Sequence, residues 1–173
     1  QPAQLQPFVI ERIKAVVYHA LNSLQIENGA SHTELKIDNE GNIVLIEVGG
    51  RMGGDLIGSD LVELSTGIDF VQAVIKAALG EKPDMIQQHK SRAAAVRFIL
   101  SQQDIDVLEL VKREHPKYLL QEEIFQMPGK EVEDSATRCG YYLLSAERVC
   151  EIGMYLPEEN MEKKAEKIRG GGD

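Results

Sequence analysis

The sequence predicts an α+β fold in two parts, and three observations lead to this prediction. Residues 8–25 carry apolar side chains at helical spacing. Two short strand-like segments then flank a dense turn, which predicts a β-hairpin. Beyond a polar connection at 81–90, further apolar segments predict a second group of strands.

The first part is expected to begin with a helix followed by the hairpin. The helix is predicted over 8–25, and Asn28-Gly29 is expected to end it. The hairpin strands are predicted at 31–37 and 43–48, on either side of the turn sequence Asp-Asn-Glu-Gly-Asn. The apolar stripe of the helix consists of Val9, Ile13, Val16, Val17, Ala20, Leu21 and Leu24.

A glycine-rich loop at 49–58 and two helices complete the first part. Ser59 or Asp60 is expected to cap a short helix that runs to about Ser65. A second helix is predicted over 69–79, with Gly80 after its end.

The second part is expected to start after the polar connection, which contains Pro83. We therefore predict two domains, at 1–82 and 83–173. Strands are predicted at 92–100, 118–125 and 140–144, a terminal helix at 161–168 and a frayed tail at 169–173.

Composition excludes several classes of protein. Apolar residues make up 43% of the 173 residues, which is enough for a hydrophobic core. The formal charge of −9 argues against nucleic-acid and anionic-membrane partners. No apolar run approaches the roughly 18 residues that a membrane span needs, and residues 1–7 do not resemble a signal peptide. We therefore expect a cytoplasmic protein with neither kind of partner.

The two cysteines, Cys139 and Cys150, match no zinc-binding spacing. Paired and unpaired forms both remain open from the sequence. Reduced thiols are the preferred interpretation, in keeping with the cytoplasm.

Pairing the hairpin strands gives the first indication of chemistry. With the turn centred between residues 40 and 41, Glu34 lies opposite Glu47. On the same face, His32 is then opposite Gly49, and Lys36 is opposite Leu45. Opposed residues have Cβ atoms about 4.5–5.5 Å apart, so the two carboxylates repel each other.

A divalent cation would relieve this repulsion. The Coulomb energy between unit charges about 4 Å apart is about 4 kcal/mol at an effective dielectric of 20. Carboxylate oxygens are ligands that magnesium prefers, and substrate phosphates can complete its coordination shell. Two alternatives stay open: a solvent-exposed pair with Lys36 neutralising Glu34, or a loop of odd length that makes the pair diagonal.

The residues that follow the second strand favour a metal–phosphate site. Glu47 precedes Gly49 and Gly50, where the backbone can approach a ligand closely. Arg51 then offers a fixed charge and a planar group suited to phosphate or carboxylate.

Three motifs in this order resemble the end of an ATP-grasp domain. The motifs are Gly29-Ala-Ser-His-Thr-Glu-Leu-Lys36, Leu45-Ile-Glu-Val-Gly-Gly-Arg51 and Val62-Glu-Leu-Ser-Thr-Gly-Ile-Asp69. The similarity is strongest to the amino-acid ligase branch and covers about 29–80. Segments 91–99 and 134–142 resemble the C-terminal cap of that family more loosely. The resemblance implies the C-terminal half of an ATP-grasp domain, an antiparallel sheet with packed helices, followed by a small α+β cap.

The resemblance assigns roles to individual residues. Glu34 and Glu47 take the positions of the two metal-binding glutamates, and Gly49 stands where many members have an asparagine ligand. Arg51 takes the position of the catalytic arginine, which also contacts the nucleotide phosphates. The substrate-binding candidates are Gly53, Gly54 and His32, although a packing or surface role for His32 is preferred.

The chemistry implied by the resemblance uses ATP and Mg²⁺, with Mn²⁺ as a substitute. ATP activates a carboxylate as an acyl phosphate, and an amine then displaces phosphate. The ATP-binding lysines and the adenine-reading hinge of the family belong to an upstream half. The implied partners are therefore small-molecule carboxylate and amine substrates and that missing N-terminal half, and we expect this chain alone to be inactive.

Several alternatives remain at the level of the sequence. One is a subunit that resembles biotin carboxylase or carbamoyl phosphate synthase, with bicarbonate as the acid. Another is a non-catalytic ATP-grasp remnant, and a homodimer is also left open. Arg138 is expected in an exposed turn, with a role in the site as the alternative.

Overall fold

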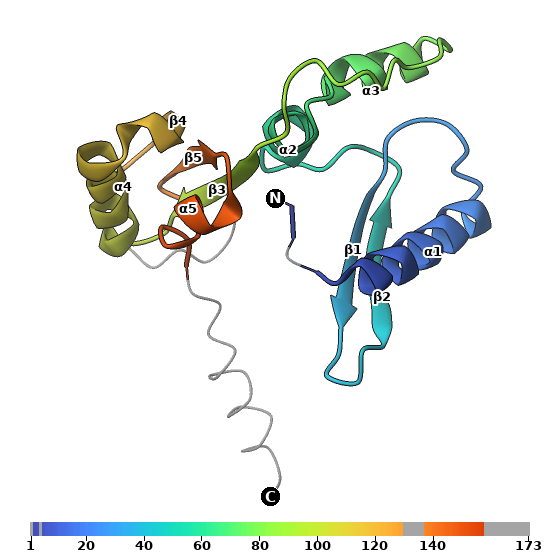
Figure 1. Cartoon of the computed structure of the whole chain (residues 1–173), viewed down its shortest axis with the longest axis horizontal. Helices are drawn as coiled ribbons and strands as arrows, with labels where there is room; N and C mark the ends of the chain where they lie inside the picture. The colour runs from blue at the N-terminus through green and yellow to red at the C-terminus, as the bar shows by residue number, and fades with distance from the viewer. Residues whose placement is uncertain (1, 4, 130–136, 158–173) are drawn as a thin grey trace, which may run out of the picture.

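The computed structural model describes residues 2–3, 5–129 and 137–157. Within them lie a two-stranded sheet in the order β1-β2 and a three-stranded sheet in the order β3-β5-β4. Figure 1 shows the two sheets in separate parts of the molecule, with α2 and α3 between them along the chain. This is the mixed α+β architecture that the sequence predicts. The predicted helix at 161–168, the tail and part of the cap-like segment 134–142 lie outside the described residues.

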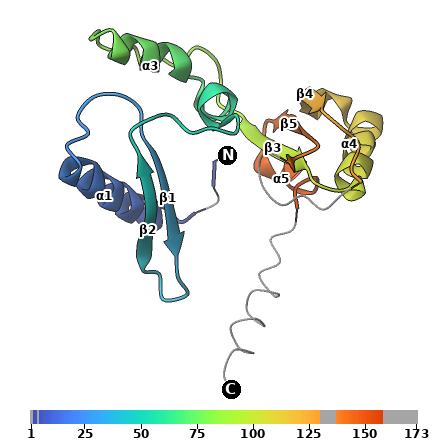
Figure 2. The same cartoon turned by 180° about the vertical axis from the view of Figure 1, so that it is seen from behind.

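The first sheet is a hairpin accompanied by one helix. Helix α1 covers Pro7–Ser23, strand β1 His32–Ile37 and strand β2 Ile43–Gly49. In Figures 1 and 2, α1 runs alongside the hairpin, and it contacts β2. Proline in the first turn suits the helix start because its missing N–H would be unpaired there. The helix ends earlier than predicted, because Gln25 turns the chain with φ 56° before Asn28-Gly29 is reached.

The register of the hairpin confirms the central pairing and corrects one of its neighbours. Glu34 is opposite Glu47, and His32 is opposite Gly49. Lys36 is opposite Val44, so the predicted pairing with Leu45 is wrong.

The reason for this correction lies in the turn. The backbone N–H of Asp38 donates to the carbonyl of Asn42, which closes a five-residue loop of odd length and shifts the register by one. An irregularity between Glu34 and Leu35 then reverses the shift. The opposed glutamates therefore depend on a bulge that the loop length alone would not predict.

Downstream of the hairpin, the chain forms a π-helical turn η1 at Ile57–Leu61 and then α2 at Val62–Thr66. The turn starts before Ser59, and neither it nor α2 has a side-chain cap, so the predicted capping by Ser59 or Asp60 is wrong. Helix α3 spans Phe70–Ala78, and Asp69 caps it by accepting from the backbone N–H of Gln72 at 2.8 Å.

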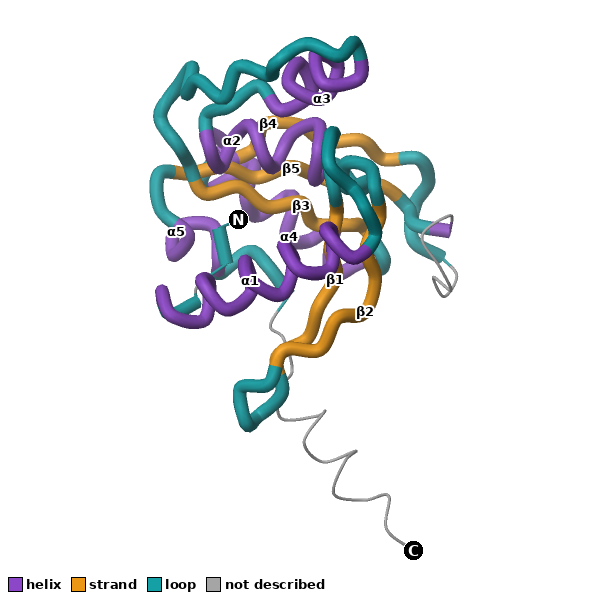
Figure 3. The backbone as a smooth tube through the Cα atoms, turned by 90° about the vertical axis from the view of Figure 1, so that its right-hand side faces the viewer, coloured by secondary structure: helices purple, strands orange, loops and turns teal. Residues whose placement is uncertain are grey.

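The second sheet carries most of the hydrophobic core. Strand β3 is Ala93–Ile99, β4 is Leu119–Ile124 and β5 is Gly140–Ala146, and β5 pairs antiparallel with both neighbours. Helix α4 at Gln102–Glu114, a 3₁₀ turn η2 at Pro116–Tyr118 and α5 at Val149–Gly153 accompany the sheet. We refer to β3–α5 as the cap; Figure 3 shows its strands from the side.

Alternate residues of β3 serve two different clusters. Ala93, Ala95 and Ile99 join the main core with α4 and α5. Ala94 instead packs with Leu61 of η1 and with β5, so the opposite face of the sheet contacts the first part of the chain. Because successive side chains of a strand point to opposite faces, β3 packs on the cap core with one face and on η1, which follows the glycine-rich loop, with the other.

The sequence interpretation did not assign α4 or α5. A signal for α4 is present, because Ser101 and Asp104 form a capping box and apolar residues recur at 105, 108 and 111. Within the described residues, none of the helices is both long and apolar enough to cross a membrane.

Candidate active site

The site begins with the two acidic residues that the hairpin sets side by side. Glu34 in β1 and Glu47 in β2 are direct partners across the ladder, and both are exposed. Opposed side chains in such a pair lie about 4.5–5.5 Å apart at Cβ. Two like charges at that separation destabilise the hairpin unless a counter-charge is present.

The donors present fit a magnesium ion that completes its coordination with other oxygens. Carboxylates are hard ligands, and magnesium commonly takes one or two of them together with phosphates and water. In the described ranges no group of three or more His, Cys, Asp or Glu side chains could hold a metal by itself. Gly49, which follows at the end of β2, has no side chain to add a third ligand.

Arg51 is the basic residue of the site. It directly follows Gly49 and Gly50 and is exposed. One guanidinium nitrogen, Nη1, donates to the carbonyl of Met52 at 2.9 Å. This bond holds one edge of the planar guanidinium against its own loop.

His32 and Gly53 bring the strand and the loop into contact. A Cβ atom at Gly53 would lie 3.0 Å from His32 Cδ2 and 3.0 Å from Ile57 Cγ2, so the glycine permits close packing there. His32 is half-buried and Gly53 is buried, whereas Gly54 is exposed. The close approach of His32 to Gly53 therefore supports a packing role for His32.

The structure joins two further residues at the glycine-rich loop: Asp55, which has no role in the sequence analysis, and Arg138, for which a role in the site is the alternative there. Asp55, next to Gly54, accepts from Arg138 of the cap, with Nη1 and Oδ1 2.8 Å apart. Arg138 is not in an exposed turn, since only 22% of its side chain is accessible. The two residues are 83 positions apart, so no local pattern could have paired them.

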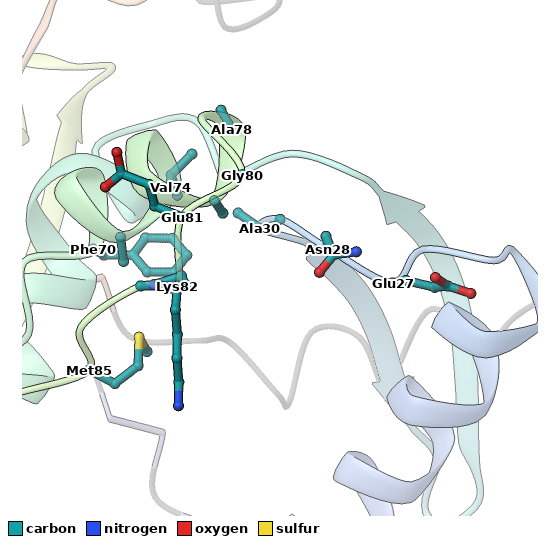
Figure 4. A pocket seen from close by; sticks show the side chains of 14 residues that line it. Glu27, Asn28, Ala30, Phe70, Val74, Ala78, Gly80, Glu81, Lys82 and Met85 are labelled. Atoms are coloured by element: carbon teal, nitrogen blue, oxygen red, sulfur yellow. The ribbon is translucent and has the colours of Figure 1, made fainter.

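A described cavity lies away from these residues. It has a volume of about 840 Å³ and lies between the loop after α1 and helix α3. Figure 4 shows Asn28 on one side and Phe70, Val74 and Met85 on the other. None of the predicted site residues lines it. The acidic pair and Arg51 instead belong to an exposed strand and loop surface.

Comparison with known families identifies the fold to which this surface belongs. Residues 1–60 match the family model of the ATP-grasp domain. The match contains the acidic pair, the glycines and Arg51, and it ends before α2. Residues 1–60 are thus similar to an ATP-grasp domain, which confirms the predicted resemblance.

Solved structures agree with this assignment. An L-amino acid ligase from Bacillus licheniformis is similar with a TM-score of 0.67 and 28% identity, over 89% of this chain and 40% of its own. A phosphoribosylglycinamide synthetase from Anaerococcus prevotii has a TM-score of 0.66 and 18% identity, over 97% and 41%. The biotin carboxylase domain of the Hydrogenobacter thermophilus 2-oxoglutarate carboxylase, solved as a dimer with MgADP and bicarbonate, has a TM-score of 0.51 and 18% identity, over 84% and 34%.

The similarity extends through most of this chain but through a minority of each relative. The chain spans about 40% of the length of the first two structures. Its described α+β fold is thus part of an ATP-grasp fold. A comparison with curated proteins found no match.

Proposed function

We propose that this chain is the C-terminal part of an ATP-dependent carboxylate–amine ligase of the amino-acid ligase branch. The observation that supports it most directly is the register that sets Glu34 opposite Glu47, followed by Arg51. The 28% identity to an L-amino acid ligase favours an amino acid as the carboxylate. We keep the domain division at 1–82 and 83–173 as part of this proposal.

In the proposed mechanism, Glu34 and Glu47 would hold Mg²⁺, or Mn²⁺ in its place, beside the phosphates of ATP. The metal, when bound, offsets negative charge on those phosphates. Arg51 stabilises the charge that develops on the transferred phosphoryl group and on the acyl phosphate. Gly53 and Gly54 let the backbone approach the substrate, and His32 supports Gly53 from β1.

The chemistry balances without a protein nucleophile. A substrate carboxylate oxygen attacks the γ-phosphorus of ATP, and the bond to the ADP oxygen breaks. The amine nitrogen then attacks the acyl carbon, the carbon–oxygen bond to phosphate breaks, and the amine releases a proton to solvent. Positioning and charge stabilisation supply the catalysis, as in other phosphoryl transfers.

The exposed apolar side chains of the first part support a missing N-terminal half. Phe8 and Tyr18 of α1 are 64% and 66% exposed, and Val44 and Ile46 of β2 are 49% and 53% exposed. Exposed apolar side chains can contribute to contact surfaces. We propose that the upstream half of the ATP-grasp domain covers them and supplies the remaining ATP contacts.

The remaining features of the proposal concern the cellular setting. Both cysteines are free thiols, Cys139 buried and Cys150 exposed, which favours the reducing cytoplasm. A homodimer stays a prediction.

Magnesium-dependent nucleotide binding by the complete protein tests the function. Glu47→Ala is expected to abolish Mg²⁺-dependent ATP binding in calorimetry, because one of two carboxylate ligands is lost. The matched control is Glu40→Ala, an exposed acid in the turn of the same hairpin, which should bind as the unmodified protein does. Equal binding by Glu47→Ala and the unmodified protein would contradict the metal role.

The substrate class is tested by ADP release. Release that depends on amino acids supports the ligase. Release that depends on bicarbonate alone would favour the biotin carboxylase-like alternative, and absence of both would favour a non-catalytic remnant.

A further inference from the structure

Arg138 joins the cap to the glycine-rich loop through two contacts of different kinds. Its Nη1 donates to Asp55 Oδ1 at 2.8 Å. Its Cζ atom lies 3.7 Å from the centre of the Phe98 ring in β3, which is a cation–π contact. Arg138 is therefore held by the cap sheet on one side and by the loop on the other.

These contacts make the ion pair different from an ordinary surface pair. The side chain of Arg138 is only 22% exposed, while that of Asp55 is 51% exposed. The backbone around Arg138 is also fixed, because the next residue, Cys139, donates its N–H to the carbonyl of Ile99 at 2.8 Å. A partly desolvated arginine that is already ordered loses little further entropy when it binds its acid.

The loop that Asp55 belongs to needs outside support. Asp55 and Leu56 both have left-handed backbones, with φ 52° and 62°, a region that residues other than glycine rarely occupy. Inside the loop, the N–H of Gly58 donates to the carbonyl of Gly53 at 3.1 Å, and that of Ile57 to Gly54 at 2.8 Å. Such a conformation persists when its surroundings fix it.

Two parts of the chain restrain this loop from outside. His32 of β1 packs against Gly53, and Arg138 binds Asp55 two residues later. Gly54, the exposed glycine, lies between the two contacts. The conformation of the segment that is proposed to bind substrate is thus set jointly by the hairpin and by the cap.

We propose that Arg138 is a positioning residue for substrate binding. Through Asp55 it holds the Gly53–Gly54 segment in the form that accepts the amino-acid substrate, so that the cap takes part in substrate selection. Arg138 itself touches no reacting atom. The inference about substrate rests on the proposed function, whereas the restraint on the loop can be tested in this chain alone.

Amide hydrogen exchange of the 173-residue chain tests the restraint. In Arg138→Ala, the amides of Ile57 and Gly58 are expected to exchange about tenfold faster, because loop opening loses a partly buried ion pair. The core amides of β3 and β5 should keep their protection, which separates the effect from unfolding of the cap. The matched control is Arg113→Ala, whose side chain is 71% exposed and pairs with Glu114.

Two further variants test whether the effect depends on the ion pair between Arg138 and Asp55. Asp55→Asn should reproduce the faster exchange, and Arg138→Lys should restore part of the protection because an ammonium can still pair with Asp55. Unchanged exchange at Ile57 and Gly58 in Arg138→Ala would overturn the restraint.

Kinetics of the complete protein test the substrate role. Arg138→Ala is expected to raise KM for the amino acid about fivefold to tenfold while KM for ATP and kcat stay near their original values. Equal changes in KM for ATP, or no change in any constant, would overturn the positioning role. If the unmodified protein has no ligase activity, the proposed function fails, while the exchange result still decides whether the loop is restrained.

Discussion

The hairpin region and the cap differ sharply in how much of their apolar surface is buried. Across 5–52 no residue is buried, although this region includes a 17-residue helix and both strands of the hairpin. In the cap, Leu108, Val111 and Leu144 are completely inaccessible. Burial of apolar surface is the main favourable term in folding, so the two regions should differ in stability.

The proposed functional residues and the main hydrophobic core therefore lie in different regions of the chain. The proposed metal, phosphate and substrate contacts all lie in the poorly buried part or in the loop after it. The cap has its own core and contacts that loop through Arg138. A site built on a weakly packed hairpin therefore depends on its neighbours for order.

The largest predicted effect concerns the buried ion pair of the cap. Arg97 Nη2 and Asp104 Oδ1 are 2.7 Å apart, and both side chains are nearly inaccessible. Asp104→Ala leaves a buried arginine without its acid, and we expect a loss of about 3–5 kcal/mol in the free energy of unfolding. Tyrosine fluorescence during urea unfolding measures it, because three of the five tyrosines lie in the cap and Tyr155, just after α5, is buried in the same core. Asp106→Ala, an exposed acid on the same helix, should change little, and a similar loss there would refute the assignment.

The second prediction compares apolar truncations in the two regions. Leu108→Ala removes a fully buried side chain of α4 and should cost roughly 3 kcal/mol. Val44→Ala in β2 removes a side chain that is 49% exposed and should cost less than about 1 kcal/mol. Urea unfolding of both variants gives the comparison. Equal costs would mean that the hairpin surface is covered in solution, for example by a second copy of the chain.

The smallest predicted effect is a pH dependence of the cap. Burial by itself raises the pKa of Asp104, but bonds from the Leu100 N–H, Arg97 and Ser101 outweigh it and hold the pKa below its usual value. Because the folded pKa is the lower one, this carboxylate stabilises the cap fully above an unfolded pKa of about 3.9, and the contribution disappears as the pH falls through the folded value. Urea midpoints between pH 6 and 2.5 measure the loss. Asp104→Asn should show a shallower dependence, and an identical slope would assign the effect to other acids.

More of the candidate site than of the cap can be predicted from the sequence. Local patterns predict the hairpin and the glycine-rich loop. They also predict Glu34 opposite Glu47, but in the structure this pairing depends on the bulge between Glu34 and Leu35. The predicted pairing of Lys36 with Leu45 is wrong because the odd loop shifts the register by one. The bulge between Glu34 and Leu35 restores the register only for the residues that precede it in β1. Helix α4 was not assigned although its capping box at Ser101 and Asp104 is visible in the sequence.

By itself, the sequence determined the order of acids, glycines and arginine, because these residue types stand close together along the chain, as the proposed metal–phosphate site requires. Only the tertiary structure decided that Arg138 lies against Phe98 and binds Asp55. That contact forms where β3 and β5 bring distant segments together. Hydrophobic packing of the whole sheet determines which distant residues come into contact. The periodicity of a single segment cannot predict such contacts.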